Sequence, residues 1–164
     1  MAGHSMGGCV ALEAAAQLKH NPQLQEIILV DTFGLPYGDM DQQTIDSVET
    51  PFIENFVSAM EYLVDNTTSS IINPDTRLWI KRRMSSANPE LMLPVWHDLL
   101  RWSPDNAFQN IHCPIYALNG EHIPNAANIR CAPYVQSQVL EGCHHFPQFE
   151  HPALFFKQLE GLLP

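Results

Sequence analysis

The stretch Gly3-His4-Ser5-Met6-Gly7 places a serine in a glycine–x–serine–x–glycine pattern. A serine in this pattern sits on a tight turn between a strand and a helix, where side chains at the glycine positions would collide with neighbouring backbone. The helix that follows directs its positive dipole end at the turn, and the Met6 N–H points to where an oxyanion would form. The pattern therefore predicts that Ser5 is a nucleophile and that Met6 is an oxyanion-hole donor.

The residues downstream predict alternating helices and strands. A helix is expected over residues 7–18, where apolar residues recur at helical spacing, and the apolar run "IILVD" predicts a buried parallel strand at 27–31. The later elements are expected as strands at 113–121 and 134–142, a short helix at 125–131, and a final helix from Pro152 onward. Alternation of this kind is typical of a parallel α/β sheet.

Residues 39–102 differ from the rest of the chain because they show helix signals and no strand pattern. Three pairs place a capping residue before a proline suited to a first helical turn: Thr50-Pro51, Asn73-Pro74 and Asn88-Pro89. We therefore expect a helical cap at 39–102, inserted into an α/β core made of residues 1–38 and 103–164.

The charge balance limits the classes of partner. The chain of 164 residues has 18 acidic side chains against 8 Lys and Arg, a formal net charge of −10. Nucleic acids and anionic membrane surfaces are excluded as expected partners, because binding phosphates needs clustered basic residues. The one dense basic run, Lys81-Arg82-Arg83, is interpreted as the solvated face of a helix.

Features of cellular location point to a cytoplasmic protein. No signal-peptide pattern is found at residues 1–17, and no apolar run approaches the roughly 18 residues of a membrane span. The four cysteines are scattered along the chain and are expected to be free thiols: Cys9, Cys113, Cys131 and Cys143.

A serine hydroxyl is a poor nucleophile unless a base takes its proton. Two histidines, His144 and His145, directly follow the last expected strand, where a loop brings an imidazole over the edge of the sheet. From the residues alone, either histidine is a candidate base for Ser5.

With these motifs the sequence resembles the α/β-hydrolase superfamily of the serine hydrolase type with a helical cap. Members often end with Gly-x-Gly-His-Phe, a few residues, Glu-x-Pro and a helix. Aligned on Gly142, Phe146 and Pro152, the family histidine falls on His145, and His144 occupies the second glycine position. The resemblance implies that His145 is the base, with His144 as the alternative.

The acid that orients this histidine has two candidates. Family members commonly carry Gly-x-x-Asp after the strand that resembles residues 115–120, but here Gly120 is followed by Glu121, and Ile123 stands at the aspartate position. Glu121 is taken as the acid because its long side chain can reach from an adjacent turn position. Asp31 is the alternative acid, since it ends the preceding strand and some members place their acid there.

No cofactor or metal is expected. The sequence has no G-x-G-x-x-G and no P-loop motif. Six further histidines lack the spacing of a zinc site: His4, His20, His97, His112, His122 and His151.

The resemblance implies two-step acyl transfer to water, with small esters, thioesters or C–C diketone-type compounds as substrates. It covers the whole chain but only the second half of the family's fold, since the earlier strands and the strand that leads into the Ser5 turn have no expected counterpart. The alternative expectation is a non-catalytic truncated fragment or module. Its strand at 27–31 would have an unpaired edge that pairs with itself in a homodimer or with an N-terminal half.

Overall fold

Four parallel strands form the sheet around which the chain folds. The structure, a computed structural model, describes residues 1–18 and 21–163. The strands are β1 (Ala2–His4), β2 (Ile27–Val30), β3 (Ile115–Asn119) and β4 (Val135–Val139). The helices are α1 (Met6–Leu18), α2 (Gln42–Glu54), α3 (Phe56–Thr67), α4 (Pro74–Ser85), α5 (Pro89–Leu100), α6 (Asp105–Asn110), α7 (Asn125–Cys131), α8 (Pro147–Glu150) and α9 (Pro152–Glu160).

The strand order in the sheet is β1-β2-β3-β4, the same as the order in the chain. All three pairings are parallel, as the alternation of helices and strands predicts. In the central pair, Leu29 lies opposite Ala117. Every residue of β2 is buried, which explains why its sequence is continuously apolar and not alternating.

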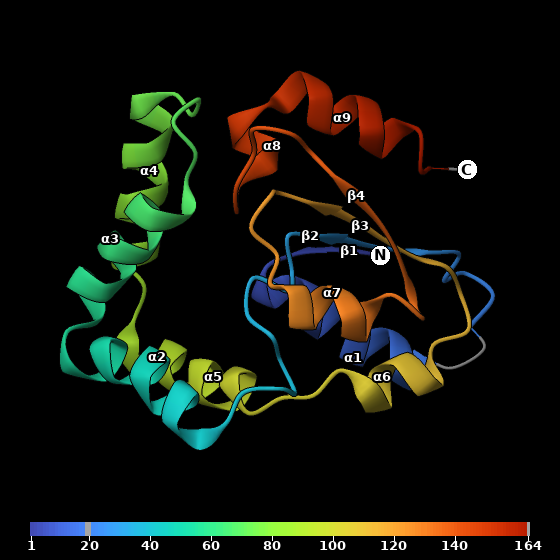
Figure 1. Ribbon diagram of the computed structural model, residues 1–164, viewed down its shortest axis with the longest axis horizontal. Coiled ribbons are helices and arrows are strands. Elements are labelled where there is room, and N and C mark those ends of the chain that lie inside the picture. Colours follow the sequence, from blue (N-terminus) through green and yellow to red (C-terminus); the bar gives the residue numbers. More distant parts are fainter. Residues whose placement is uncertain (19–20, 164) are drawn as a thin grey trace.

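The two faces of the sheet have separate cores. Alternate residues of β2 and β3, such as Leu29 and Ala117, pack with α1, α6 and α7 in the larger core. Val30 and Leu118 point to the other face and pack with Phe155 of α9. Figure 1 shows this arrangement, with α9 on one side of the sheet and α1 and α7 on the other. The carboxyl ends of all the strands therefore open at one edge, where loop residues can meet.

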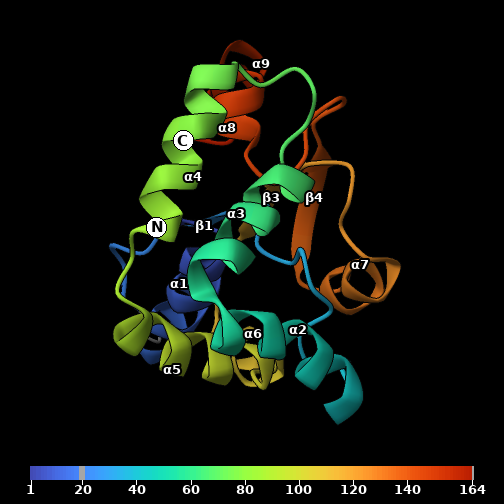
Figure 2. The same cartoon turned by 90° about the vertical axis from the view of Figure 1, so that its left-hand side faces the viewer.

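The helical insertion, which we define as α2 to α5, lies between β2 and β3 in the chain. Figures 1 and 2 show α3 and α4 standing beside the sheet, at the end where α8 lies. Asn73 and Asn88 accept hydrogen bonds from the first turns of α4 and α5, as predicted. The prediction at Thr50-Pro51 is wrong, because Pro51 lies inside α2 and Asn55 caps the next helix by accepting from the Ser58 N–H.

The strand before Ser5 is also a correction. From the sequence no strand is expected there, whereas β1 pairs with β2 over three residues, from Ala2 opposite Ile28 to His4 opposite Val30. Backbone hydrogen bonds continue past both ends, from the Ile28 N–H to the Met1 carbonyl and from the Ser5 N–H to the Val30 carbonyl. The flank of β2 is therefore covered, and the edge of the sheet is β1.

Candidate active site

Ser5 lies on a strained turn between β1 and α1. Its backbone is left-handed, with φ of 53°, a conformation that few non-glycine residues adopt. A Cβ atom on Gly3 would lie 2.2 Å from the Gly7 carbonyl oxygen, and one on Gly8 would lie 1.9 Å from Thr32 Oγ1. The predicted collision with neighbouring backbone is confirmed for Gly3 and wrong for Gly7, whereas the contact at Gly8 is with the Thr32 side chain. A Cβ atom on Gly7 would meet nothing within 4 Å outside its own helix turn, so space does not require a glycine there.

Three side chains form a hydrogen-bonded chain at the carboxyl ends of the strands. His145 Nε2 lies 3.0 Å from Ser5 Oγ, and His145 Nδ1 lies 2.6 Å from Asp31 Oδ2. A carboxylate only accepts, so Nδ1 carries the proton and Nε2 of the neutral ring accepts from the serine hydroxyl. The arrangement has the geometry needed to activate a serine.

Asp31, and not Glu121, is the acid that the structure places against His145. Asp31 is buried, has a left-handed φ of 44°, and uses its second oxygen to accept from the Gly120 N–H at 2.7 Å. Glu121 instead accepts from the Gly142 N–H at 2.8 Å. The expectation for Glu121 is wrong, because the His145 Nδ1 position is taken by Asp31 and the Glu121 carboxylate accepts from the Gly142 N–H.

The loop that carries His145 is fixed by hydrogen bonds on both sides. The His145 N–H donates to the Thr67 carbonyl at the end of α3, and His4 Nε2 lies 2.6 Å from the His145 carbonyl oxygen. The buried carboxylate of Glu150 accepts from the backbone N–H groups of Ser69 and His144. These contacts hold the imidazole over Ser5.

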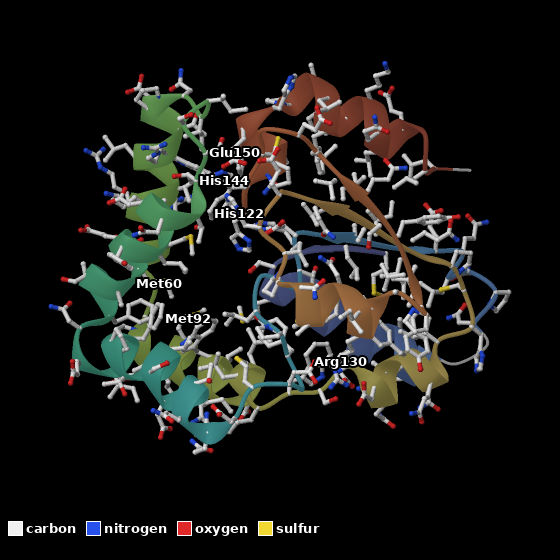
Figure 3. The ribbon with its side chains drawn as sticks, viewed as in Figure 1. Met60, Met92, His122, Arg130, His144 and Glu150 are labelled. Atoms are coloured by element: carbon white, nitrogen blue, oxygen red, sulfur yellow. The ribbon has the colours of Figure 1, made fainter. Side chains whose placement is uncertain are left out.

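His144, the alternative base, is directed elsewhere. Its Nε2 lies 2.9 Å from Nε2 of His122, and the two rings meet edge to face. Figure 3 shows both histidines near Glu150. The imidazole that lies against the Ser5 hydroxyl is that of His145.

His4 is a residue that the sequence analysis does not connect with the site. It is half-buried between the ring of His145, 4.8 Å away, and that of Phe146, 5.2 Å away. Burial, reinforced by the nearby His145, lowers the pKa of His4 to about 4. His4 is therefore neutral at pH 7, and its Nε2–H donates to the His145 carbonyl. Its position next to the serine is the one signal that could have indicated this contact.

Met6 is the first residue of α1, so helix geometry leaves its N–H without an intrahelical partner. Met6 also lines the cavity that contains Ser5. This placement agrees with the donor role expected for the Met6 N–H.

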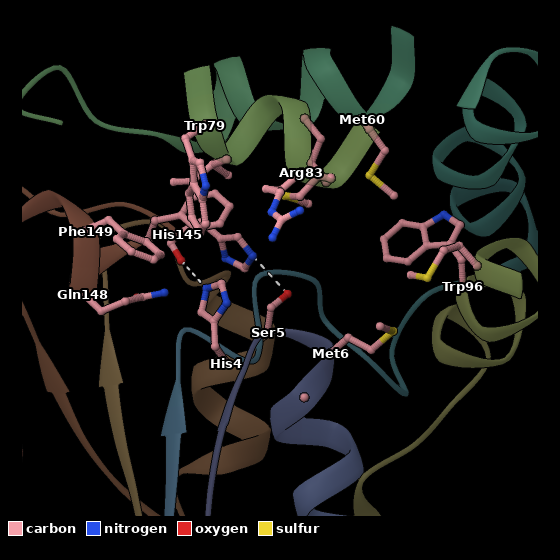
Figure 4. A pocket seen from close by; sticks show the side chains of 16 residues that line it. His4, Ser5, Met6, Met60, Trp79, Arg83, Trp96, His145, Gln148 and Phe149 are labelled. Atoms are coloured by element: carbon pink, nitrogen blue, oxygen red, sulfur yellow. Dashed lines mark hydrogen bonds between the residues drawn. The ribbon is translucent and has the colours of Figure 1, made fainter. Parts of the chain in front are cut away.

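A cavity of about 370 Å³ opens above Ser5 and His145. Its sheet side holds Ser5 and His145, and its far side is made of residues of the helical insertion, including Met60, Met92 and Trp96. Figure 4 shows these side chains around the opening, and Figure 3 shows Met60 and Met92. The lining is mainly apolar, as is usual for pockets that bind small organic molecules.

Three further features of the described residues bear on the sequence expectations. No group of three or more His, Cys, Asp or Glu side chains is arranged to hold a metal ion within residues 1–18 and 21–163, and His20 lies outside them. All four cysteines are free thiols. No helix in this part of the chain is long and apolar enough to cross a membrane.

Comparisons with known proteins define the class. Among solved structures, a bromoperoxidase from Bacillus anthracis matches with a TM-score of 0.79 and 15% identity over 97% of this chain and 64% of its own. An esterase from Exiguobacterium antarcticum matches with a TM-score of 0.77 and 14% identity over 98% of this chain and 64% of its own. A 2-hydroxy-6-oxo-6-phenylhexa-2,4-dienoate hydrolase from Rhodococcus sp. strain RHA1 matches with a TM-score of 0.68 and 15% identity over 98% of this chain and 62% of its own.

These similarities establish the fold as that of the α/β hydrolases. The chain spans less than two thirds of the length of these three structures. Residues 1–158 match the alpha/beta hydrolase family, and the chain belongs to that family. A comparison with curated proteins found no match.

Proposed function

We propose that the chain is a serine hydrolase that cleaves small esters or related acyl compounds. The observation that carries the proposal is the hydrogen-bonded chain from Ser5 through His145 to Asp31, with distances of 3.0 Å and 2.6 Å. A serine, a base and a buried carboxylate in this order give a hydroxyl the reactivity needed to attack a carbonyl.

The proposed reaction has two steps. His145 Nε2 takes the proton of Ser5 as Oγ bonds to the ester carbonyl carbon, and the Met6 N–H donates to the resulting oxyanion. The carbon–oxygen bond to the alcohol then breaks, and the imidazolium gives its proton to the leaving alcohol. Water attacks the acyl-enzyme in the same way and releases the acid and free Ser5. Asp31 keeps the imidazole in the correct tautomer and stabilises its charged form.

The substrate class is proposed from the shape and chemistry of the cavity. A volume of about 370 Å³ lined by Met60, Met92 and Trp96 suits a short apolar acyl or aryl group. The similar structures include an esterase and a 2-hydroxy-6-oxo-6-phenylhexa-2,4-dienoate hydrolase, so cleavage of an ester or of an activated carbon–carbon bond suits this fold. In this proposal the helical insertion acts as the cap that shapes the acyl pocket.

The proposal is tested with p-nitrophenyl acetate and a fluorophosphonate probe that labels reactive serines. The wild-type chain should hydrolyse the ester and take up the probe at Ser5. Ser5→Ala should lower kcat/KM by at least about 10³-fold and abolish labelling, because the nucleophile is removed. Ser47→Ala, at an exposed serine of α2, is the matched control.

Equal hydrolysis and labelling by wild type and Ser5→Ala would refute the proposal. Labelling that is lost equally in Ser47→Ala would show non-specific reaction and would also count against it.

A second candidate function, from another class, is pairing through the edge of the sheet. It is favoured by β1, since within residues 1–18 and 21–163 no strand covers its outer flank. The bonds of Met1 and Ser5 to β2 leave the N–H and carbonyl of Ala2 directed outward. The partner would be a strand of a second copy or of a separate chain that supplies preceding strands.

This candidate is tested by size-exclusion chromatography with light scattering over a range of protein concentrations. A dimer that Ala2→Pro dissociates and Ala2→Val does not would support pairing, because proline removes the outward N–H. A monomer at all concentrations would refute homodimer formation.

A further inference from the structure

Arg83 is the one cavity-lining side chain with a fixed charge among the residues that the structure describes. It extends from α4, and Figure 4 shows its guanidinium group directed into the cavity that contains Ser5 and His145. The neighbouring lining residues on the same helix, Trp79 and Met84, are apolar. Arg83 is itself exposed, so its guanidinium group lies where the cavity meets solvent.

The helical period explains why this arginine differs from its neighbours in the basic run. Trp79, Ile80, Arg83 and Met84 all line the cavity, and their spacing of three and four residues places them on one face of α4. Lys81 lies off that face and is paired with Asp65. Arg83 is exposed, as the interpretation of the run as a solvated face predicts, and it also lines the cavity at its solvent-open side.

Arg83 also differs from the paired arginines of this chain. Arg101 is paired with Glu49 at 2.9 Å, and Arg130 binds both Asp39 and Asp105. The Arg83 side chain makes no hydrogen bond or ion pair within the described residues, although the chain carries 18 acidic side chains. All five of its N–H donors are therefore available to a ligand in the cavity.

We propose that the cavity selects substrates whose acyl part carries a carboxylate, and that Arg83 is the residue that binds it. This inference rests on the proposed hydrolase function. The planar guanidinium matches a carboxylate with two parallel hydrogen bonds. The acyl chain would lie against Trp79 and Met84, with its carbonyl at Ser5 and its carboxylate at Arg83.

The inference is tested with two matched esters. One is mono-p-nitrophenyl glutarate, and the other is its glutaramate counterpart, in which an uncharged amide replaces the carboxylate. The wild-type chain should prefer the glutarate ester. Arg83→Met should reduce the ratio of the two kcat/KM values by about five-fold, the upper end of the effect of losing a solvent-exposed ion pair.

Two further variants make the test specific. Arg83→Lys should restore part of the preference, since it keeps the charge and loses the planar fork. Arg82→Met, at the exposed neighbour that does not line the cavity, should leave the ratio unchanged. An equal loss for both esters in Arg83→Met would overturn the inference, because it would assign Arg83 to the oxyanion or to folding.

A binding measurement separates this inference from the proposed hydrolase function. Isothermal titration calorimetry of Ser5→Ala with 4-phenylbutyrate and with 4-phenylbutanamide needs no turnover. Tighter binding of the carboxylate, lost in the Ser5→Ala, Arg83→Met double variant, would support anion recognition even if Ser5 were unreactive. Equal binding of both compounds beside a Ser5-dependent esterase would refute the role of Arg83 and leave the hydrolase proposal intact.

Discussion

The two sides of the cavity are constrained by different kinds of interaction. On the sheet side, Ser5 and Asp31 have left-handed backbones and His145 is held through its own N–H and carbonyl. On the side of the helical insertion, residues such as Met92 and Arg83 contribute side chains only. The sheet side, together with the Thr67 carbonyl at the end of α3, fixes the positions of the reacting atoms through the backbone. Side chains on α4 and α5, such as Arg83 and Met92, can change without disturbing those contacts.

The largest expected effect is at the acid. Asp31→Asn should lower kcat/KM by about 10⁴-fold, because an amide at this position favours the wrong tautomer of His145. Glu121→Gln should stay within a few-fold of wild type, since Glu121 bonds only to the Gly142 N–H. Esterase assays and rates of fluorophosphonate labelling measure both variants. A larger loss in Glu121→Gln than in Asp31→Asn would contradict the arrangement of the site.

The next effect separates two glycines of the same motif. Gly3→Ala should destabilise the fold by at least about 3 kcal/mol, because the new Cβ would overlap the Gly7 carbonyl. Gly7→Ala has open space and should raise stability by about 0.5 to 1 kcal/mol through reduced chain entropy. Urea denaturation followed by circular dichroism measures both. Equal free energies of unfolding for the two variants would show that the close approach of Gly3 to the Gly7 carbonyl does not require a glycine.

A pH effect of similar size is expected at His4. Its pKa in the folded protein is about 4, below the ordinary value of 6.5. As pH falls from 6.5 to 4, the unfolded chain takes up a proton that the folded chain does not, so stability is lost through this range. His4→Gln keeps a donor and cannot titrate, so its stability should fall by about 3 kcal/mol less than that of wild type between pH 7 and pH 4. The free energy of unfolding is measured by urea denaturation at each pH. Parallel pH profiles for wild type and His4→Gln would rule out a contribution of His4 to the loss of stability.

The smallest expected effect is on the insertion side. Met92→Ala should raise KM for p-nitrophenyl butyrate about five-fold with kcat nearly unchanged, because the contact is made equally in the ground state and the transition state. Leu91→Ala, at a 69% exposed neighbour that does not line the cavity, is the control. A fall in kcat equal to the change in kcat/KM would show that the insertion side also takes part in the chemistry.

The parts of the site that could be predicted are those with local signals. Gly3 has a steric requirement that comes from Gly7, four residues away, and the helix and strand periods around it are equally local. The position of His145 could be inferred from its flanking residues. The three residues of β1 are too few to show a strand pattern, so that strand could not be predicted from them.

The acid could not be chosen from the sequence for a spatial reason. Asp31 and Glu121 both follow a buried strand, and those two strands are neighbours in the sheet. The choice depends on the left-handed turn at Asp31 and on the Gly120 N–H from which its carboxylate accepts, and both are features of the folded chain. The helix start predicted at Thr50-Pro51 is wrong for a comparable reason, because the cap of α3 is Asn55, four residues after Pro51.

The hydrogen bond from the His145 N–H to the Thr67 carbonyl has a mechanical consequence. Together with the Glu150 carboxylate, which joins Ser69 to His144, it couples the end of α3 to the imidazole loop. Separating these two segments would break at least two hydrogen bonds, the one from His145 to Thr67 and one of the two that Glu150 accepts. The end of α3 therefore stays with the loop that carries His145. A wider cavity that keeps His145 beside Ser5 requires movement of later parts of the insertion, such as α5.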